Sequence, residues 1–72
     1  MITYTVRFEG ADGPVYYRGL SDVYAAEVLE TTVPYLLHTI QEHGICSTPD
    51  GIAVEDGTDV EKAIEKFAKE GS

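Results

Sequence analysis

The sequence predicts a small two-layer α+β domain, in which helices pack on one face of an antiparallel sheet. Residues 2–9 alternate between apolar and polar side chains, as a half-buried strand does. Residues 58–70 repeat apolar side chains at helical spacing, and turn residues separate the shorter segments between them. The expected order is therefore ββ-α(α)-ββ-α. With 72 residues, the chain has room for one domain, 1–72, around one thin core.

Residues 2–18 are expected to form a β-hairpin. The alternation from Ile2 to Phe8 places four apolar side chains on one face and the polar ones on the other. The glycines of segment 10–13 supply turn chemistry. Pro14 is compatible with the start of a second strand but not with its centre.

Residues 22–43 have helical spacing, but Pro34 interrupts the pattern. A proline inside a helix removes a hydrogen bond and clashes with the preceding turn. Either one long helix kinks near Val33, or one helix ends near Thr31 and a second begins at Thr32. The second arrangement is slightly favoured, because these threonines can cap a helix that has proline in its first turn.

The final third of the chain predicts a short hairpin followed by a helix. Residues 45–54 contain two apolar pieces around 48–51, a Thr-Pro-Asp-Gly sequence that matches a type I turn. Residues 58–70 form the clearest amphipathic helix. Thr58 is expected to cap it, with Glu61 completing a capping box.

The expected core follows from these periodicities. Because a phenylalanine deep in the core is expensive to truncate, Phe67→Ala is expected to cost ~3–5 kcal/mol. The residues expected in the core are Val6, Phe8, Leu29, Leu36, Ile40, Ile64 and Phe67.

The composition is strongly acidic, with 13 Asp and Glu against 5 Lys and Arg and a formal net charge of −8. Residues 1–49 carry six acids and two bases, and residues 50–72 carry seven and three, so the bias is not confined to a tail. Such a chain repels nucleic acids and anionic membranes and is attracted to basic protein surfaces. The alternative is that the acidity only keeps a small protein in solution.

Nothing in the sequence predicts catalysis, a cofactor or a metal site, so we expect a protein that is not an enzyme. Phosphate-binding loops and nucleophile motifs are absent. His38 and His43 are five residues apart and do not share a helix face, and Cys46 follows in another element. A single cysteine, with no leader or membrane-spanning stretch, suggests a cytoplasmic location.

The candidate contact residues are acidic. Much of the cluster at residues 55–61 is also explained by helix capping and by the helix dipole. Tyr16 and Tyr17 are consecutive and therefore face opposite sides of their strand. One of them is expected near Arg7 and Arg18 on the face away from the helices, so Tyr16 is added to the candidates. Packing of a tyrosine against threonines explains the same position as well. The expected partner-binding residues are Glu55, Asp56, Asp59, Glu61, Glu9, Asp12 and Tyr16.

In size, acidity and lack of motifs the chain resembles phage or mobile-element accessory proteins that block host machinery, anti-CRISPR and anti-restriction proteins among them. The resemblance covers no residue pattern and implies no particular site. It implies an inhibitor or adaptor that occupies a basic, nucleic-acid-binding surface on a larger protein, in the manner of a nucleic-acid mimic. The alternative is a self-associating homodimeric module, since the apolar residues of 23–40 exceed what one sheet can cover.

Overall fold

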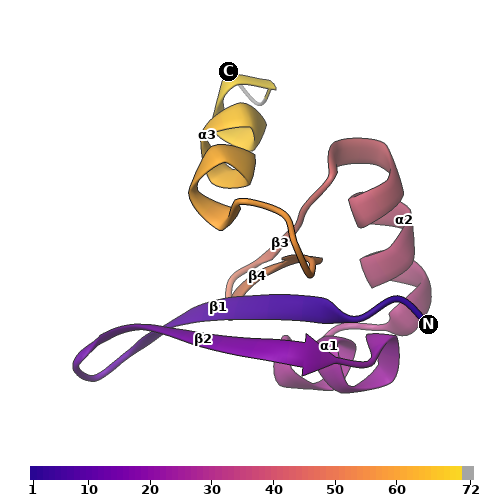
Figure 1. Ribbon diagram of the computed structural model, residues 1–72, viewed down its shortest axis with the longest axis horizontal. Coiled ribbons are helices and arrows are strands. Elements are labelled where there is room, and N and C mark those ends of the chain that lie inside the picture. The colour runs from indigo at the N-terminus through magenta and orange to yellow at the C-terminus, as the bar shows by residue number, and fades with distance from the viewer. Residues whose placement is uncertain (71–72) are drawn as a thin grey trace.

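The computed structural model describes residues 1–70 and confirms a small α+β domain built on one four-stranded antiparallel sheet (Figure 1). The strands lie in the order β2-β1-β4-β3. β1 is therefore an inner strand, which pairs with β2 along one edge and with β4 along the other. The elements are β1 (Tyr4–Gly10), β2 (Gly13–Leu20), α1 (Asp22–Val28), α2 (Val33–His43), β3 (Cys46–Thr48), β4 (Gly51–Glu55) and α3 (Val60–Glu70).

The first hairpin is confirmed, but it begins at Tyr4 and continues to Leu20, two residues beyond its expected end. The pairs Val6–Tyr17 and Tyr4–Leu20 leave one residue on β1 opposite two on β2, which is a β-bulge. Gly19 lies in the bulge with a φ of 73°, a conformation that glycine adopts without steric cost. Sequence alternation alone does not predict this bulge.

The helical region divides at residues 29–32, as the favoured arrangement predicted. α1 ends in a Schellman motif, in which the Thr31 amide donates to the Ala26 carbonyl at 2.9 Å and the Glu30 amide donates to Glu27 at 3.1 Å. Glu30 has a φ of 53°, in the left-handed region. Thr32 then caps α2 by accepting a hydrogen bond from the Tyr35 amide. Pro34 falls in the first turn of α2, where it costs no helical hydrogen bond.

The second hairpin is also confirmed, with Thr48 paired to Gly51 across a two-residue turn. A side chain at Gly51 would meet the Arg7 carbonyl oxygen at 2.7 Å and Leu29 at 3.0 Å. Glycine is therefore required here by the close approach of the β3–β4 turn to β1 and to the end of α1.

The start of α3 differs from the expected capping box. The helix begins at Val60, and the Asp59 carboxylate accepts the Lys62 amide at 3.2 Å, so Asp59 and not Thr58 is the cap. The Thr58 amide instead closes a turn onto the Glu55 carbonyl. Gly57, the third residue of that turn, has a φ of 94°, which suits a type II turn and moves the helix start one residue along the chain.

The helices divide between the two faces of the sheet. α1 and α2 cover the face that carries Tyr4 and Val6, whereas Figure 1 shows α3 on the other side of the β1–β2 hairpin from α1. Thr5 and Val54, paired across β1 and β4, are buried on that second face. The chain thus covers both faces of the sheet, each incompletely.

Four of the seven expected core residues are buried: Val6, Leu29, Leu36 and Ile40. The expectation was wrong for Phe8, Ile64 and Phe67, which are only half-buried, and no residue of α3 is buried. Phe8 packs against the edge of the main core, and the far end of the first hairpin extends beyond α1 (Figure 1). The main core is formed by Tyr4, Val6, Ala25, Ala26, Leu29, Leu36, Ile40, Cys46 and Ala53.

Candidate functional site

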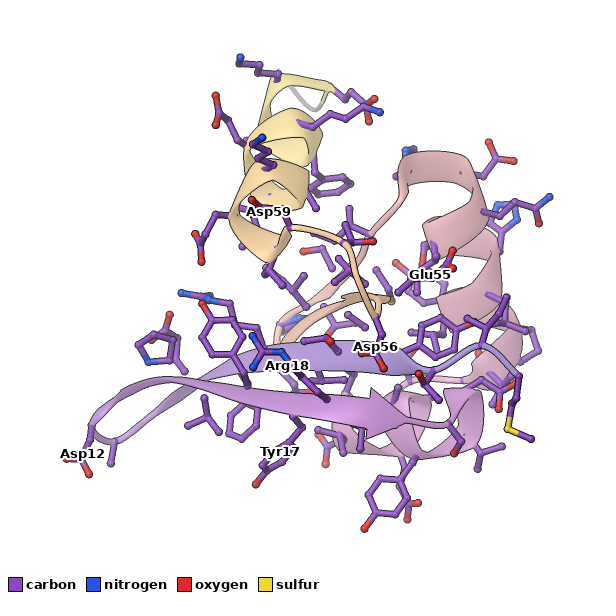
Figure 2. The ribbon with its side chains drawn as sticks, in the orientation of Figure 1. Asp12, Tyr17, Arg18, Glu55, Asp56 and Asp59 are labelled. Atoms are coloured by element: carbon purple, nitrogen blue, oxygen red, sulfur yellow. The ribbon has the colours of Figure 1, made fainter. Side chains whose placement is uncertain are left out.

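The β4–α3 loop, the start of α3 and the outward face of the first hairpin line an open depression of about 570 Å³. Four of the seven expected contact residues line it: Tyr16, Asp56, Asp59 and Glu61. Glu9 adjoins it through an ion pair with Arg7. Glu55 is exposed at the end of β4 beside Tyr4, and Asp12 lies at the distant hairpin tip (Figure 2). The sequence cluster is therefore only partly a cluster in space.

Asp56 fastens the loop to the sheet. Its carboxylate accepts hydrogen bonds from the Thr3 and Thr5 hydroxyls and, at 3.1 Å, from the Gly19 amide in the bulge. Its own amide donates to the Thr3 carbonyl at 3.0 Å. The hydroxyls of Thr3 and Thr5, then the Gly19 amide and the charge of Arg18, lower the pKa of Asp56 below its usual range.

The threonines that hold Asp56 were not among the expected site residues. The signal was present as two threonines at alternate positions, Thr3 just before β1 and Thr5 within it. Their partner lies more than 50 positions away, however, and periodicity carries no information about such a pair.

Glu61 belongs to a compact polar group with Tyr16 and Arg7. The Tyr16 hydroxyl donates to Glu61 at 3.0 Å, and Arg7 Nε lies buried 3.9 Å from the same carboxylate, beyond hydrogen-bond range. The guanidinium of Arg18 lies 5.6 Å from the Tyr16 ring centroid. The Tyr16 hydroxyl, and then the charges of Glu9 and Glu61, raise the pKa of Arg7 above its usual range. Tyr16 thus lies beside Arg7 and Arg18, as expected for one of the two tyrosines, but on the face that α3 occupies and not on a face away from the helices.

These contacts change what the depression offers to a partner. Asp56 holds the loop, Asp59 caps α3, and Glu61 and Glu9 face Arg7. Each carboxylate already has an interaction within the molecule, and two guanidinium groups share the site. The depression is a polar contact region between the hairpin and α3, in which each acid has a partner within the molecule, rather than a surface of unpaired carboxylates.

The unbalanced charge lies elsewhere. All five basic residues are on β1, β2 and α3, so none falls on α1, α2, β3 or β4. Between Arg18 and Lys62 the chain carries acids without a single Lys or Arg. Three of these acids, Asp56, Asp59 and Glu61, belong to the depression. The other six are Asp22, Glu27, Glu30, Glu42, Asp50 and Glu55. The fold therefore separates charge. The Lys and Arg residues lie on the first hairpin and α3, whereas α1, α2 and the second hairpin carry acids but no Lys or Arg.

The remaining reactive side chains are dispersed. Cys46 is fully buried, and this burial raises the pKa of its thiol, although a hydrogen bond with Thr39 acts in the opposite direction. His43 stacks edge-on against Phe67, with ring centroids 5.8 Å apart, and lies 3.8 Å from Glu70. Across residues 1–70, no three His, Cys, Asp or Glu side chains gather in a geometry suited to a metal ion.

Comparison of the chain with protein-family models, with curated proteins and with solved structures found no match. Within residues 1–70, no helix has the length and apolar character needed to cross a membrane.

Proposed function

We propose that this protein acts by stoichiometric binding to a basic surface on a larger protein, without catalysis. The observation that supports this proposal is the separation of charge in the fold. Within the segment from Gly19 to Glu55, which forms the α1–α2 layer and the second hairpin, there are six acids and no Lys or Arg. A partner with a positive surface meets no opposing cation on that side.

The mechanism follows from the net charge of −8. A negative field accelerates encounter with a basic groove and repels nucleic acid. A bound acidic domain excludes the phosphates that the groove would otherwise take, so the protein would act as an inhibitor or adaptor on a nucleic-acid-binding protein. Such an association weakens as salt rises.

The test compares two double variants of equal charge. Glu42→Lys with Glu55→Lys changes two exposed acids of the cation-free segment, neither of which forms an ion pair in the described structure. The control, Glu65→Lys with Glu70→Lys, makes the same charge change on the lysine-bearing helix α3. Each tagged protein is used for affinity capture from a lysate of the source organism at low salt, followed by mass spectrometry.

We expect the wild type and the α3 variant to capture the same nucleic-acid-binding protein in a 1:1 ratio, and the first variant to lose it. Capture that is equal for all three proteins, or insensitive to salt, would contradict the electrostatic mechanism.

Self-association is a second candidate, and exposed apolar residues favour it. Val23, Tyr35 and Leu37 are 60%, 47% and 39% exposed, so the break between α1 and α2 does not bury them. A symmetric dimer through these side chains would cover them. Light scattering at tens of micromolar separates the two candidates, since a monomer at that concentration removes this one.

A further inference from the structure

A second groove lies on the acidic side of the molecule, between the α1–α2 connection and the β3–β4 turn. Its volume is about 400 Å³, and it is open to solvent at one side. Residues from three separate segments line it, the main ones being Leu29, Glu30, Tyr35, Thr48, Pro49 and Asp50. Two features already described create it. The Schellman motif ends α1 at one wall, and Gly51 allows the β3–β4 turn to approach α1 closely at the other.

The lining combines an apolar base with a negative rim. Leu29 is almost fully buried, and Pro49 adds a second apolar surface. Tyr35 is 47% exposed, so part of its ring is available to a ligand. The carboxylates of Glu30 and Asp50 complete the rim, and within residues 1–70 neither has a hydrogen bond or an ion pair.

The groove differs in this respect from the depression beside α3. There the carboxylates accept hydrogen bonds or face Arg7, and Arg18 lies among them. Here an aromatic ring and two carboxylates occur together, with no Lys or Arg on any of the elements that form the walls. The groove therefore presents two carboxylates and an aromatic ring with no Lys or Arg side chain from its own walls to balance them.

We propose that this groove binds an arginine side chain presented by the basic partner. A guanidinium stacks on an aromatic face and donates paired hydrogen bonds to carboxylates, so it matches both parts of the lining. Tyr35 would contact the face of the guanidinium, and Glu30 and Asp50 would accept its N–H groups. The apolar part of the arginine stem would lie along Pro49. The identity of the side chain rests on the lining alone, whereas its source in a partner protein rests on the proposed function.

The backbone of Glu30 supports this assignment. The left-handed position that ends a helix is usually occupied by glycine, or by asparagine, because other residues pay a steric cost there. This chain has glutamate at that position, with a φ of 53°, and the turn fixes its backbone at the rim of the groove. The turn thus keeps a glutamate at the rim of the groove at some expense in stability.

The first experiment uses defined probes and the whole protein. N-acetyl-arginine amide is titrated into the ¹⁵N-labelled chain and followed by NMR. N-acetyl-citrulline amide, which has nearly the same shape but no charge, is the control ligand. We expect saturable shifts from the arginine probe concentrated at Glu30–Tyr35 and Ser47–Gly51, and no saturation with citrulline. Shifts of equal size at all exposed acids, or equal responses to the two probes, would overturn the proposal.

Matched variants locate the site. Glu30→Gln with Asp50→Asn removes both rim charges while keeping side-chain size, and we expect it to weaken arginine binding about fivefold, the size appropriate to two exposed ion pairs. The control, Asp12→Asn with Glu55→Gln, removes the same charge elsewhere and should change binding less than twofold. Equal weakening by the two double variants would show a net-charge effect and no groove site.

The two proposals fail in different ways. If the arginine probe binds the groove but affinity capture yields no basic protein, the docking function is wrong and the groove assignment stands. If a basic partner is captured equally by the wild type and by the Glu30→Gln/Asp50→Asn variant, docking stands and the groove is not its anchor point.

Discussion

Helices α2 and α3 have the same length of 11 residues and both are amphipathic, yet they contribute to the fold differently. α2 buries Leu36 completely and leaves Ile40 only 8% exposed. α3 has the more regular apolar stripe, but none of its residues is buried. The difference arises from position. α2 lies against the sheet and against α1. α3 has fewer contacts with the rest of the molecule, among them those of Glu61 with Tyr16 and Arg7 and that of Phe67 with His43.

The comparison teaches that a stripe of apolar residues predicts a helix but not the depth of its burial. Depth depends on which other elements the topology places opposite the stripe. In α2 these are α1 and the second hairpin, while α3 follows the last strand and reaches only the margin of the sheet (Figure 1).

The largest expected effect tests the buried helix. Leu36→Ala should lower the free energy of unfolding by about 3 kcal/mol, because a fully buried leucine leaves a cavity that close-packed neighbours cannot fill. Leu37→Ala, one position along and 39% exposed, is the matched control and should cost less than about 1 kcal/mol. Urea denaturation measures both. Equal losses would mean that α2 does not present the face described.

The next effect tests the approach of the second hairpin to α1. Gly51→Ala would place a methyl group 2.7 Å from the Arg7 carbonyl oxygen. Because that oxygen belongs to the backbone of β1, the strand must shift, and we expect a loss of roughly 2 kcal/mol by thermal or urea unfolding. An unchanged stability would show that β4 and β1 are less tightly apposed than the structure indicates.

A smaller effect is expected on α3. Phe67→Ala should cost about 1–2 kcal/mol, below the ~3–5 kcal/mol expected from sequence, because the ring is half-buried and packs edge-on against His43. A loss of similar size to that of Leu36→Ala would remove the distinction between the two helices.

The Asp56 interactions predict a pH dependence. Because hydrogen bonds from Thr3 and Thr5 lower the pKa of Asp56, its stabilisation is present above the ordinary value of 3.8 and is lost as the pH falls through the lower folded value. Asp56→Ala should therefore be less stable than wild type at pH 7, and the gap should narrow below pH 3.8. Urea unfolding at pH 7, 5 and 3 follows this gap. A gap that is independent of pH would contradict the role given to the carboxylate.

The smallest expected change is a gain. Glu30→Gly should raise the free energy of unfolding by about 0.5–1 kcal/mol, because glycine adopts the left-handed conformation without strain. The same variant should weaken arginine binding, so stability and binding would change in opposite directions. Thermal unfolding and the arginine titration, run on one sample, measure both. Loss of stability would show that Glu30 makes a contact that offsets its strain.

Local chemistry explains which parts of the fold were predictable. The hairpins, the break before Pro34 and the existence of the last helix were all predictable, since turn residues, caps and periodicity are local signals. The cap of α3 was misplaced by one residue, because Thr58 and Asp59 are both good caps and only the turn at Gly57 selects between them.

The site was less predictable, for a physical reason. Sequence identified acids at residues 55–61 but not their partners, which lie on β1 and β2. Glu30, Tyr35 and Asp50 line the same groove only because of the way in which α1, α2 and the second hairpin meet. Three elements separated along the chain must be in place before those side chains become neighbours.

The central position of β1 has a consequence for the order of folding. Its pairing with β2 is local, but its other edge pairs with β4, which follows nearly fifty residues later in the chain. Closing so long a loop costs chain entropy before any sheet contact repays it, so we expect this step to limit the folding rate. During synthesis the same edge stays unpaired until residues 51–55 have left the ribosome, so the nascent chain is most prone to aggregate before β4 emerges.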